Sequence, residues 1–427
     1  MKLKTRFLSM NQRTSLVAVL MTTFLDWVGL GLIYPVVATL FFNSQMTFFM
    51  PDVSQAARSI IFGLVLTCTS LVEVIFAPLL GYISDWYGRK KVILAALFCG
   101  MLGYLLMAFS IVCSSVFLFI IARMILGIYS SSSGVYSAAI ADVSSTEGKT
   151  HNFGLYNTVC GAGFVLSPVF GGVLSEKALY VPFVLAALIV LGNMIIITTR
   201  FADGVCGGVE PGSASNQAVF KKFSVLKAFR SAFSTLFLVG FGWSLYSEFA
   251  PAARISLYGF TAIELGAIYT YESLFYMVGC LLLVRPLISW LGQEKALPIS
   301  AFFMSGSIAL LYVQKSAFML WICLPLQQVW SAVYNVTSAA WISNTTPDSK
   351  QGQMLGLQTA VQSIAFTLAP AIGGLIFALN IDMPLLFGAA GILLGALAYT
   401  GVVSAGLRLY RRYRGKLSPG QHIPVLK

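Results

Sequence analysis

Long apolar stretches alternate with short polar segments along almost the whole chain. Most of these stretches approach or exceed the roughly 20 apolar residues that a helix needs to cross a hydrocarbon layer about 30 Å thick. Spanning segments in lipid satisfy their backbone hydrogen bonds internally, so we expect each to be helical. The pattern predicts an all-α membrane protein with twelve transmembrane helices, at 15–42, 59–82, 92–112, 116–140, 154–175, 180–200, 231–252, 262–285, 297–313, 316–341, 354–379 and 383–407.

One polar segment divides these spans into six and six. Residues 201–230 are rich in Gly, Ser and Asn and end in a basic cluster, which is typical of a linker. We therefore predict an N-terminal six-helix bundle at 1–200, a cytoplasmic linker at 201–230, and a C-terminal six-helix bundle with a basic cytoplasmic tail at 231–427.

The two halves also share an internal repeat. Gly163, Ser167 and Gly171 place small residues at i, i+4 and i+8, on one helix face, where a neighbouring backbone can approach closely. Pseudo-symmetric bundles of this kind are an architecture of secondary transporters, with the substrate site between the halves. The full motif is Gly154, Gly163, Ser167, Pro168, Gly171 and Gly172 in the fifth span, and Gly356, Ala365, Ala369, Pro370, Gly373 and Gly374 repeat its spacing in the eleventh.

Composition agrees with a lipid environment. Of the 427 residues, 58% are hydrophobic and only 10% are charged, more apolar surface than a water-soluble core of this size can bury. The formal net charge of +12 could suggest a nucleic-acid partner, but the basic residues lie in short loops rather than on one soluble face. The expected partners are the lipid bilayer, a small-molecule substrate and protons, with no nucleic acid.

The basic residues also predict orientation, because Lys and Arg resist translocation and stay cytoplasmic. The run at 15–42 is too long for a signal peptide and is expected to be a retained first span. With the N-terminus inside, the even span count places both termini in the cytoplasm, and we expect a monomer in a bacterial inner membrane. The cytoplasmic side then collects Arg89, Lys90, Lys91, Lys149, Lys221, Lys222, Lys227, Lys295, Lys350, Arg408, Arg411, Arg412, Arg414 and Lys416, against Arg58, Lys177, Arg254 and Lys315 outside.

Several site classes lack their residues in this sequence. The seven cysteines are widely spaced, and His151 and His422 fall in a loop and a tail, so we expect no metal site. No Gly-Lys-Ser/Thr phosphate loop and no zinc-type His-Glu helix is present, and no soluble segment is large enough for a catalytic domain. The sequence therefore predicts neither a cofactor nor an enzyme.

The loop between the second and third spans carries the most specific motif. It is Gly81-Tyr-Ile-Ser-Asp85-Trp-Tyr-Gly88-Arg89-Lys90-Lys91, and it resembles the signature loop of the major facilitator superfamily. Glycine permits a tight turn, Asp85 can meet a helix N-terminus or an arginine, and the basic residues hold the loop inside. The resemblance implies a gating role for Gly81, Asp85, Gly88, Arg89 and Lys90.

The second half contains a degenerate copy of this loop at 287–295. Ser289 takes the acidic position and Arg285 takes that of the first glycine. If the loop acts as a gate between the halves, only the N-terminal copy is intact.

Three further segments resemble the drug:proton antiporter branch of the superfamily. They are the first-span segment from Thr23 to Pro35, the fourth-span segment Ala122-Arg123-Met-Ile-Leu-Gly127, and the fifth-span motif, which departs from the branch only at Ser167, where glycine is expected. Within that branch the first half is most similar to the tetracycline-efflux group, at Glu73-Val-Ile-Phe-Ala-Pro78-Leu-Leu-Gly81 and Ile140-Ala-Asp142.

Ionisable side chains within spans are costly in lipid and indicate function or a helix-joining role. Asp26, Glu73, Arg123 and Glu272 are the candidates for proton coupling. Low dielectric disfavours an ionised carboxylate, which lets it bind and release a proton, and we expect Arg123 or Glu73 to be the partner of Asp26. Another three charged residues, Glu248, Arg254 and Glu264, are expected to be solvated near the outer span ends.

The tenth span offers candidates for substrate recognition. Gln328, Tyr334 and Asn335, with Gln327 and Trp330 nearby, form a polar and aromatic mixture suited to a cavity wall. The same mixture is found at membrane interfaces and between packed helices.

The family resemblance implies a secondary active transporter that exports a small organic compound or drug in exchange for protons by alternating access. Proton-coupled uptake or symport of a metabolite is compatible with the same fold, because fold does not fix direction. A non-transporting membrane receptor or membrane enzyme is the alternative from a different class.

Overall fold

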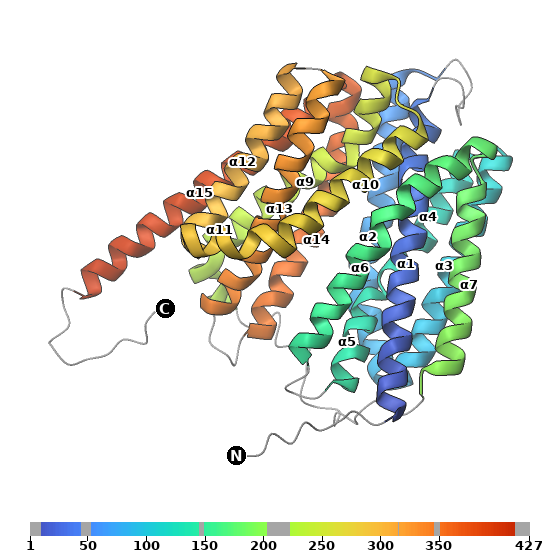
Figure 1. Cartoon of the computed structure of the whole chain (residues 1–427), viewed down its shortest axis with the longest axis horizontal. Coiled ribbons are helices and arrows are strands. Elements are labelled where there is room, and N and C mark those ends of the chain that lie inside the picture. Colours follow the sequence, from blue (N-terminus) through green and yellow to red (C-terminus); the bar gives the residue numbers. More distant parts are fainter. Residues whose placement is uncertain are drawn as a thin grey trace. The chain divides into compact units, whose positions relative to one another are not determined.

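The computed structural model describes residues 10–43, 53–144, 149–202, 223–314, 316–345 and 351–414, in which every regular element is helical (Figure 1). Most of the predicted linker and the tail after Arg414 lie outside these ranges. The first half contains α1 (Met10–Phe42), α2 (Gln55–Tyr87), α3 (Arg89–Val112), α4 (Val116–Ser130), α5 (Ser133–Val143), α6 (Lys149–Lys177) and α7 (Val181–Arg200). The second half contains α9 (Phe223–Tyr258), α10 (Ala262–Val278), the π-helix η1 (Gly279–Leu283), α11 (Val284–Leu291), α12 (Gln293–Gln314), α13 (Ala317–Thr345), α14 (Gln351–Leu379) and α15 (Met383–Arg414).

Eleven helical stretches in the described residues are long and apolar enough to cross a membrane. Two of them combine consecutive elements, because α4 and α5 form the span Val116–Val143, and α10, η1 and α11 form Ala262–Leu291. The remaining predicted span, 231–252, lies within α9, which is 36 residues long. The prediction of an all-α protein with twelve transmembrane helices is confirmed.

The contacts between Cα atoms group the chain into two compact units. Unit 1 contains Met1–Ser213 and Pro251–Ser273, and unit 2 contains Ala214–Ala250 and Leu274–Lys427. The hairpin made by the end of α9 and the start of α10 therefore packs with unit 1, although the sequence suggests a place in the second bundle. The predicted domain boundaries at 200 and 231 stay a prediction.

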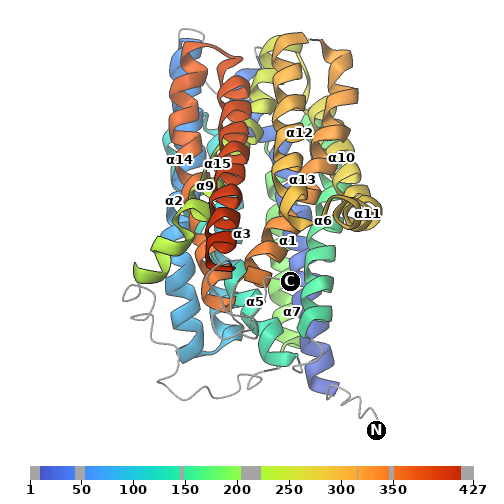
Figure 2. The ribbon, with the colours of Figure 1, turned by 90° about the vertical axis from the view of Figure 1, so that its left-hand side faces the viewer.

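In unit 1, α1 lies against α6 and α7 along much of its length (Figures 1 and 2). The small residues of α6 explain the close approach. A Cβ atom on Gly163 would lie 2.6 Å from the backbone oxygen of Phe24, and one on Gly171 would collide with the backbone of Leu32. Larger side chains at these two positions would force α1 and α6 apart.

The other motif residues of α6 differ in their surroundings. Gly154 has open space where a Cβ atom would stand, whereas a Cβ atom on Gly172 would lie 2.5 Å from the backbone oxygen of Ala262 in the hairpin. Pro168 lies inside α6, and the hydroxyl of Ser167 donates to the backbone oxygen of Gly163 over 2.8 Å. Steric need for a small residue is therefore clear at Gly172 but not at Gly154.

Unit 2 repeats this arrangement with its own helices. The equivalent of α6 is α14, and both helices are 29 residues long. Gly373 occupies the repeat position of Gly171, and a Cβ atom there would collide with the ring of Phe249 on α9. The repeat detected in the sequence therefore corresponds to equivalent helix contacts, α1 with α6 in unit 1 and α9 with α14 in unit 2.

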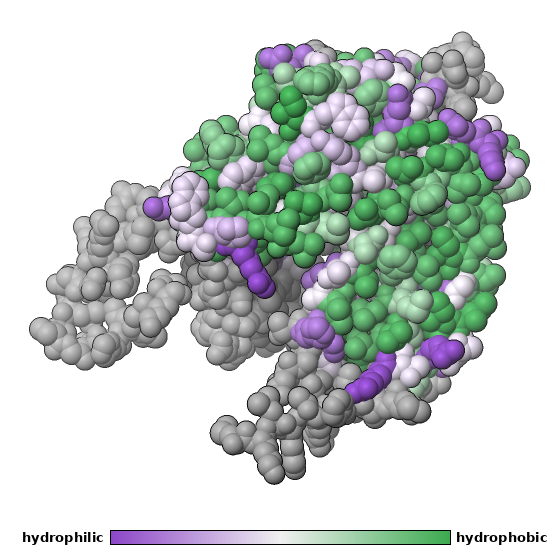
Figure 3. Space-filling model, in the orientation of Figure 1, coloured by the Kyte–Doolittle hydropathy of each residue, from purple (hydrophilic) through white to green (hydrophobic). Residues whose placement is uncertain are grey.

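The described helices are largely apolar on the face shown in Figure 3. On α7, for example, Leu188 is 57% exposed and Ile195 is 59% exposed. A water-soluble protein would not leave apolar side chains of this size exposed over contiguous helix faces, whereas lipid solvates them.

Candidate functional site

Asp26 lies in unit 1, in the middle of α1, and is half-buried. The side-chain amide of Asn193 on α7 donates to its Oδ1 atom over 2.5 Å. The phenol groups of Tyr129 on α4 and Tyr136 on α5 lie close to the carboxylate. Side chains from three other helices therefore lie around one acid, and none of these three neighbours carries a positive charge.

Local chain features explain how the two tyrosines reach Asp26. The fourth span breaks into α4 and α5 at Ser131 and Ser132, and Tyr129 and Tyr136 lie on the two sides of this break. A Cβ atom on Gly100 of α3 would lie 2.7 Å from the ring of Tyr129, so only glycine leaves room for that ring. Gly100 therefore gives the ring of Tyr129 its place beside α3.

The hydrogen bond to the Asp26 carboxylate comes from Asn193, and the pairing of Asp26 with Arg123 or Glu73 stays a prediction. Arg123 lies on α4, and the hydroxyl of Tyr104 on α3 is within electrostatic range of both Arg123 and Asp26. Arg123 and Asp26 therefore both act electrostatically on the same tyrosine.

Glu73 lies on α2 and is half-buried. Its backbone oxygen accepts a hydrogen bond of 3.2 Å from the hydroxyl of Ser131, at the break in the fourth span. No hydrogen bond or ion pair to its carboxylate is found within the described ranges. The structure thus places Glu73 beside the same break as the Asp26 site, without a direct contact to Asp26.

Glu272 forms a buried ion pair with a residue that sequence reasoning misplaced. Its Oε1 atom is 2.7 Å from Nη2 of Arg254, and the two side chains are 13% and 4% exposed. The expectation that Arg254 is solvated was wrong, because α9 continues to Tyr258 and keeps Arg254 inside the hairpin. Glu272 therefore has a cationic partner on the neighbouring helix of unit 1.

Two acids, Glu264 and Glu248, were also expected to be solvated near the outer span ends. Glu264 is exposed and accepts hydrogen bonds of 2.8 Å and 3.0 Å from the backbone nitrogen and hydroxyl of Thr261. The Thr261 hydroxyl in turn accepts one from the Glu264 backbone nitrogen over 3.3 Å, a capping box at the start of α10. Glu248 is half-buried within α9.

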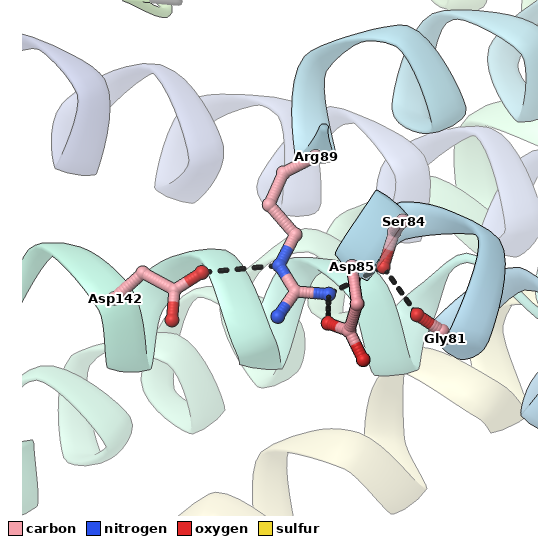
Figure 4. Close-up of polar contacts among 5 residues, drawn as sticks. All are labelled: Gly81, Ser84, Asp85, Arg89 and Asp142. Atoms are coloured by element: carbon pink, nitrogen blue, oxygen red, sulfur yellow. Dashed lines mark hydrogen bonds and ion pairs between the residues drawn. The ribbon is translucent and has the colours of Figure 1, made fainter. Parts of the chain in front are cut away.

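The loop between α2 and α3 forms a charge network centred on Arg89 (Figure 4). Its Nη1 atom is 2.6 Å from Oδ1 of Asp85, and its Nε atom is 3.0 Å from Oδ2 of Asp142 at the end of α5. The same Nη1 atom donates to the hydroxyl of Ser84, which donates to the backbone oxygen of Gly81 over 2.7 Å. Arg89 therefore connects the ends of α2, α3 and α5.

The two motif glycines of this loop have different roles. Gly88 joins α2 to α3 with φ of 91° and ψ of 145°, a region that is essentially restricted to glycine. Gly81 lies inside α2 with open space where a Cβ atom would stand. Lys90 is half-buried on the first turn of α3.

The degenerate loop between α11 and α12 has the same turn but other polar contacts. Gly292 joins the helices with φ of 74° and ψ of 153°, close to the values at Gly88. Ser289, at the position of Asp85, donates to the backbone oxygen of Pro286 over 2.8 Å. The repeat preserves the backbone turn in both halves, whereas the acid is present only in the first.

The three tenth-span candidates lie on α13 in unit 2. Gln328 and Tyr334 are buried, at 8% and 4% exposure. Asn335 is exposed and donates to the hydroxyl of Tyr276 over 3.4 Å. Gln327 is fully buried and accepts a hydrogen bond of 3.0 Å from the hydroxyl of Tyr246 on α9.

Several polar residues of these sites were missed by sequence reasoning. Asn193 and Arg254 are polar side chains inside predicted or extended spans, and that position alone could have identified them. The phenol groups give no such signal, because tyrosine is common both in membrane cores and at interfaces. Asp142 was noted only as part of a family resemblance, and its contact with Arg89 depends on the tertiary fold.

The sequence model of the Major Facilitator Superfamily matches residues 17–313 and 233–422 of the chain. The chain belongs to the major facilitator superfamily. It is accordingly a transporter and not an enzyme.

Curated members of the superfamily with similar sequences include resistance proteins. The chain is 27% identical to "Tetracycline resistance protein, class H" of Pasteurella multocida over 382 residues, which cover 86% of this chain and 90% of the relative. It is 24% identical to "Multidrug resistance protein 2" of Bacillus subtilis, with 90% and 94% of the two chains covered.

Solved structures of the superfamily share the fold. The nucleoside transporter NupG aligns with a TM-score of 0.73 at 12% identity, covering 91% of this chain and 98% of NupG. A D-xylose–proton symporter aligns with a TM-score of 0.71 at 14% identity, covering 91% and 96%.

Proposed function

We propose that this transporter exports a small organic compound in exchange for protons, and that Asp26 binds the transported proton. The tetracycline and multidrug resistance proteins that it resembles support export of this class of compound. Those relatives come from bacteria, which favours an inner membrane, and the basic loops favour two cytoplasmic termini. We also expect the transporter to be a monomer.

The observation that carries the proposal is the environment of Asp26. A carboxylate in the middle of a membrane-spanning helix is unfavourable when ionised, and it persists where function requires it. The site supplies a hydrogen bond from the amide of Asn193 and places two uncharged phenol groups close to the carboxylate. A group held in this way can bind a proton when the site opens to one side and release it to the other.

We further propose that the Arg89 network controls the conformational change and that α13 contributes to substrate binding. Arg89 holds three helix ends together through partly exposed ion pairs, which can break and re-form. Gln328, Tyr334 and Asn335 offer hydrogen-bonding groups on α13 of unit 2. Glu73, Arg123 and Glu272 stay candidates for the proton pathway.

Everted membrane vesicles with an imposed pH gradient test the proposal, with tetracycline and ethidium as transport probes. We expect accumulation of at least one probe when the lumen is acidic, and its collapse when a protonophore is added. Asp26→Asn keeps the shape of the side chain but cannot titrate, so gradient-driven accumulation should fall more than tenfold while probe binding is partly retained.

Glu264→Gln is the matched control, because it makes the same acid-to-amide change at an exposed helix cap.

Accumulation driven only by the opposite pH gradient would support uptake or symport. If Asp26→Asn transported against a gradient as well as wild type between about pH 6 and 8, where a buried carboxylate would titrate, Asp26 would not be the coupling group.

A further inference from the structure

We propose that Asn193 is a positioning residue whose amide group responds to the protonation state of Asp26 and passes it from α1 to α7. This inference rests on the proposed function in one respect, namely that Asp26 exchanges a proton.

The first observation is the position of Asn193. It is fully buried in the middle of α7, where lipid-facing neighbours such as Ile195 are exposed. Its Nδ2 atom donates to Oδ1 of Asp26 over 2.5 Å and to the backbone oxygen of Thr22 over 3.3 Å. One amide nitrogen therefore links α7 to both the side chain and the backbone of α1.

The second observation is the other end of the same amide. The Oδ1 atom of Asn193 is buried and accepts no hydrogen bond from any described residue. A buried acceptor without a donor is unfavourable, and such groups are uncommon in native structures. The amide nitrogen of Asn193 thus has hydrogen-bond acceptors, whereas the amide oxygen lacks a hydrogen-bond donor.

Protonation of Asp26 would provide that donor. The ionised carboxylate can only accept hydrogen bonds, so it needs the NH₂ group of Asn193. Once a proton from solution binds to a carboxylate oxygen, Asp26 becomes an O–H donor, and rotation of the amide by about 180° lets Asn193 Oδ1 accept from it. The proton stays on Asp26, and Asn193 neither gains nor loses one.

The same rotation changes the contact between two helices. Turning Nδ2 away from Asp26 also removes it from the backbone oxygen of Thr22, so the hydrogen bond between α7 and the α1 backbone breaks. Protonation of one side chain would therefore alter how α1 is held against α7. This is a two-state element that proton binding can shift.

Other groups near Asp26 do not duplicate this role. Phenols can both donate and accept by rotating a hydroxyl, so they adapt to either form of Asp26 without moving a helix contact. The titratable groups that interact electrostatically with Asp26 are Tyr104 on α3, Tyr129 on α4, Tyr136 on α5, and Tyr156 and Cys160 on α6.

Infrared difference spectroscopy of the purified full-length protein, recorded during a pH titration, tests the inference without any substrate. The carboxyl band of Asp26 is assigned by its loss in Asp26→Asn. Isotope-labelled asparagine identifies the amide band of Asn193, which is assigned by its loss in Asn193→Leu. We expect the two bands in wild type to change with the same midpoint.

Asn193→Leu keeps the side-chain volume but removes the donor that favours ionised Asp26, so the Asp26 midpoint should move up by about one pH unit. Asn193→Ala serves as a second variant if leucine prevents folding. Val190→Ala, one turn away and also buried, controls for packing on α7 and should leave the midpoint unchanged.

An unchanged Asp26 midpoint in both Asn193 variants, or an amide band that does not titrate with Asp26 in wild type, would overturn the inference. A shared midpoint that shifts in the variants would support it even if the protein transported neither tetracycline nor ethidium. Failure of the export proposal and failure of this inference are therefore distinguishable.

Discussion

Two arginines of unit 1 form ion pairs of very different kinds. Arg254 pairs with Glu272 inside the hairpin, where the side chains are 4% and 13% exposed. Arg89 is 13% exposed but pairs with Asp85, which is 60% exposed, and with Asp142, which is 26% exposed. One arginine is enclosed with its acid, and the other meets two acids that remain in contact with solvent.

The difference in exposure between the two sets of ion pairs indicates different contributions to stability and to conformational change. Removing one partner of a buried pair leaves an uncompensated charge, which destabilises a protein strongly. Ion pairs with exposed partners contribute little to stability, because water solvates the charges when the pair opens. Arg254 and Glu272 are thus suited to hold a fixed hairpin, whereas the Arg89 network is suited to contacts that change during transport.

The largest effect is expected from Arg254→Leu. This change leaves Glu272 buried without its cation and should lower the free energy of unfolding by about 3–5 kcal/mol. Chemical unfolding of the purified protein in mixed micelles measures the change.

The double variant Arg254→Leu with Glu272→Leu provides the control, because it removes both charges together. It should recover most of the lost stability, since apolar replacements of a buried pair are often neutral. A double variant as unstable as Arg254→Leu alone would show that packing of the arginine, and not its charge, matters.

The next effect concerns the two loop turns. Gly88→Ala and Gly292→Ala each force a side chain into a backbone region that is essentially restricted to glycine, at a cost of about 1–3 kcal/mol. Unfolding of the two variants should show losses of similar size, because the two turns have similar φ and ψ values. Gly81→Ala, inside α2 with open space at its Cβ position, is the control and should cost less.

A smaller loss of stability is expected from Arg89→Gln. The change removes both ion pairs but leaves partners that water can solvate, so the free energy of unfolding should fall by about 1 kcal/mol or less. Transport should nevertheless fall more than tenfold if the network acts as a gate. Wild-type turnover in this variant would show that the network does not act as a gate and that the loop serves only to orient the protein in the membrane.

The smallest effect on stability is expected from Asp85→Asn, because Asp85 is mainly exposed. We expect a change well below about 1 kcal/mol and normal membrane insertion, together with impaired transport in the vesicle assay. Ser289→Ala at the equivalent position of the second loop is the matched control. Equal transport by the Asp85→Asn and Ser289→Ala variants would show that the two loops do not differ in function.

Hydropathy made the fold predictable, because each segment that crosses lipid must form its own backbone hydrogen bonds and is therefore helical. The twelve spans and the fifth-span repeat follow from local sequence, and Gly163 and Gly171 mark helix contacts through their size alone. Span ends were less certain. Arg254 was expected to be solvated beyond the end of the span at residue 252, but α9 continues to Tyr258 and Arg254 pairs with Glu272 on the next helix.

The sequence by itself therefore determined the spans, the repeat, the signature loop and the acids within the membrane. The tertiary structure decided which groups those acids meet. Asn193 is 167 positions from Asp26 along the chain, and Asp142 is 53 positions from Arg89. Hydrophobicity depends on each residue and its near neighbours, whereas hydrogen bonds between helices depend on how the helices are packed and rotated, so only the folded protein reveals them.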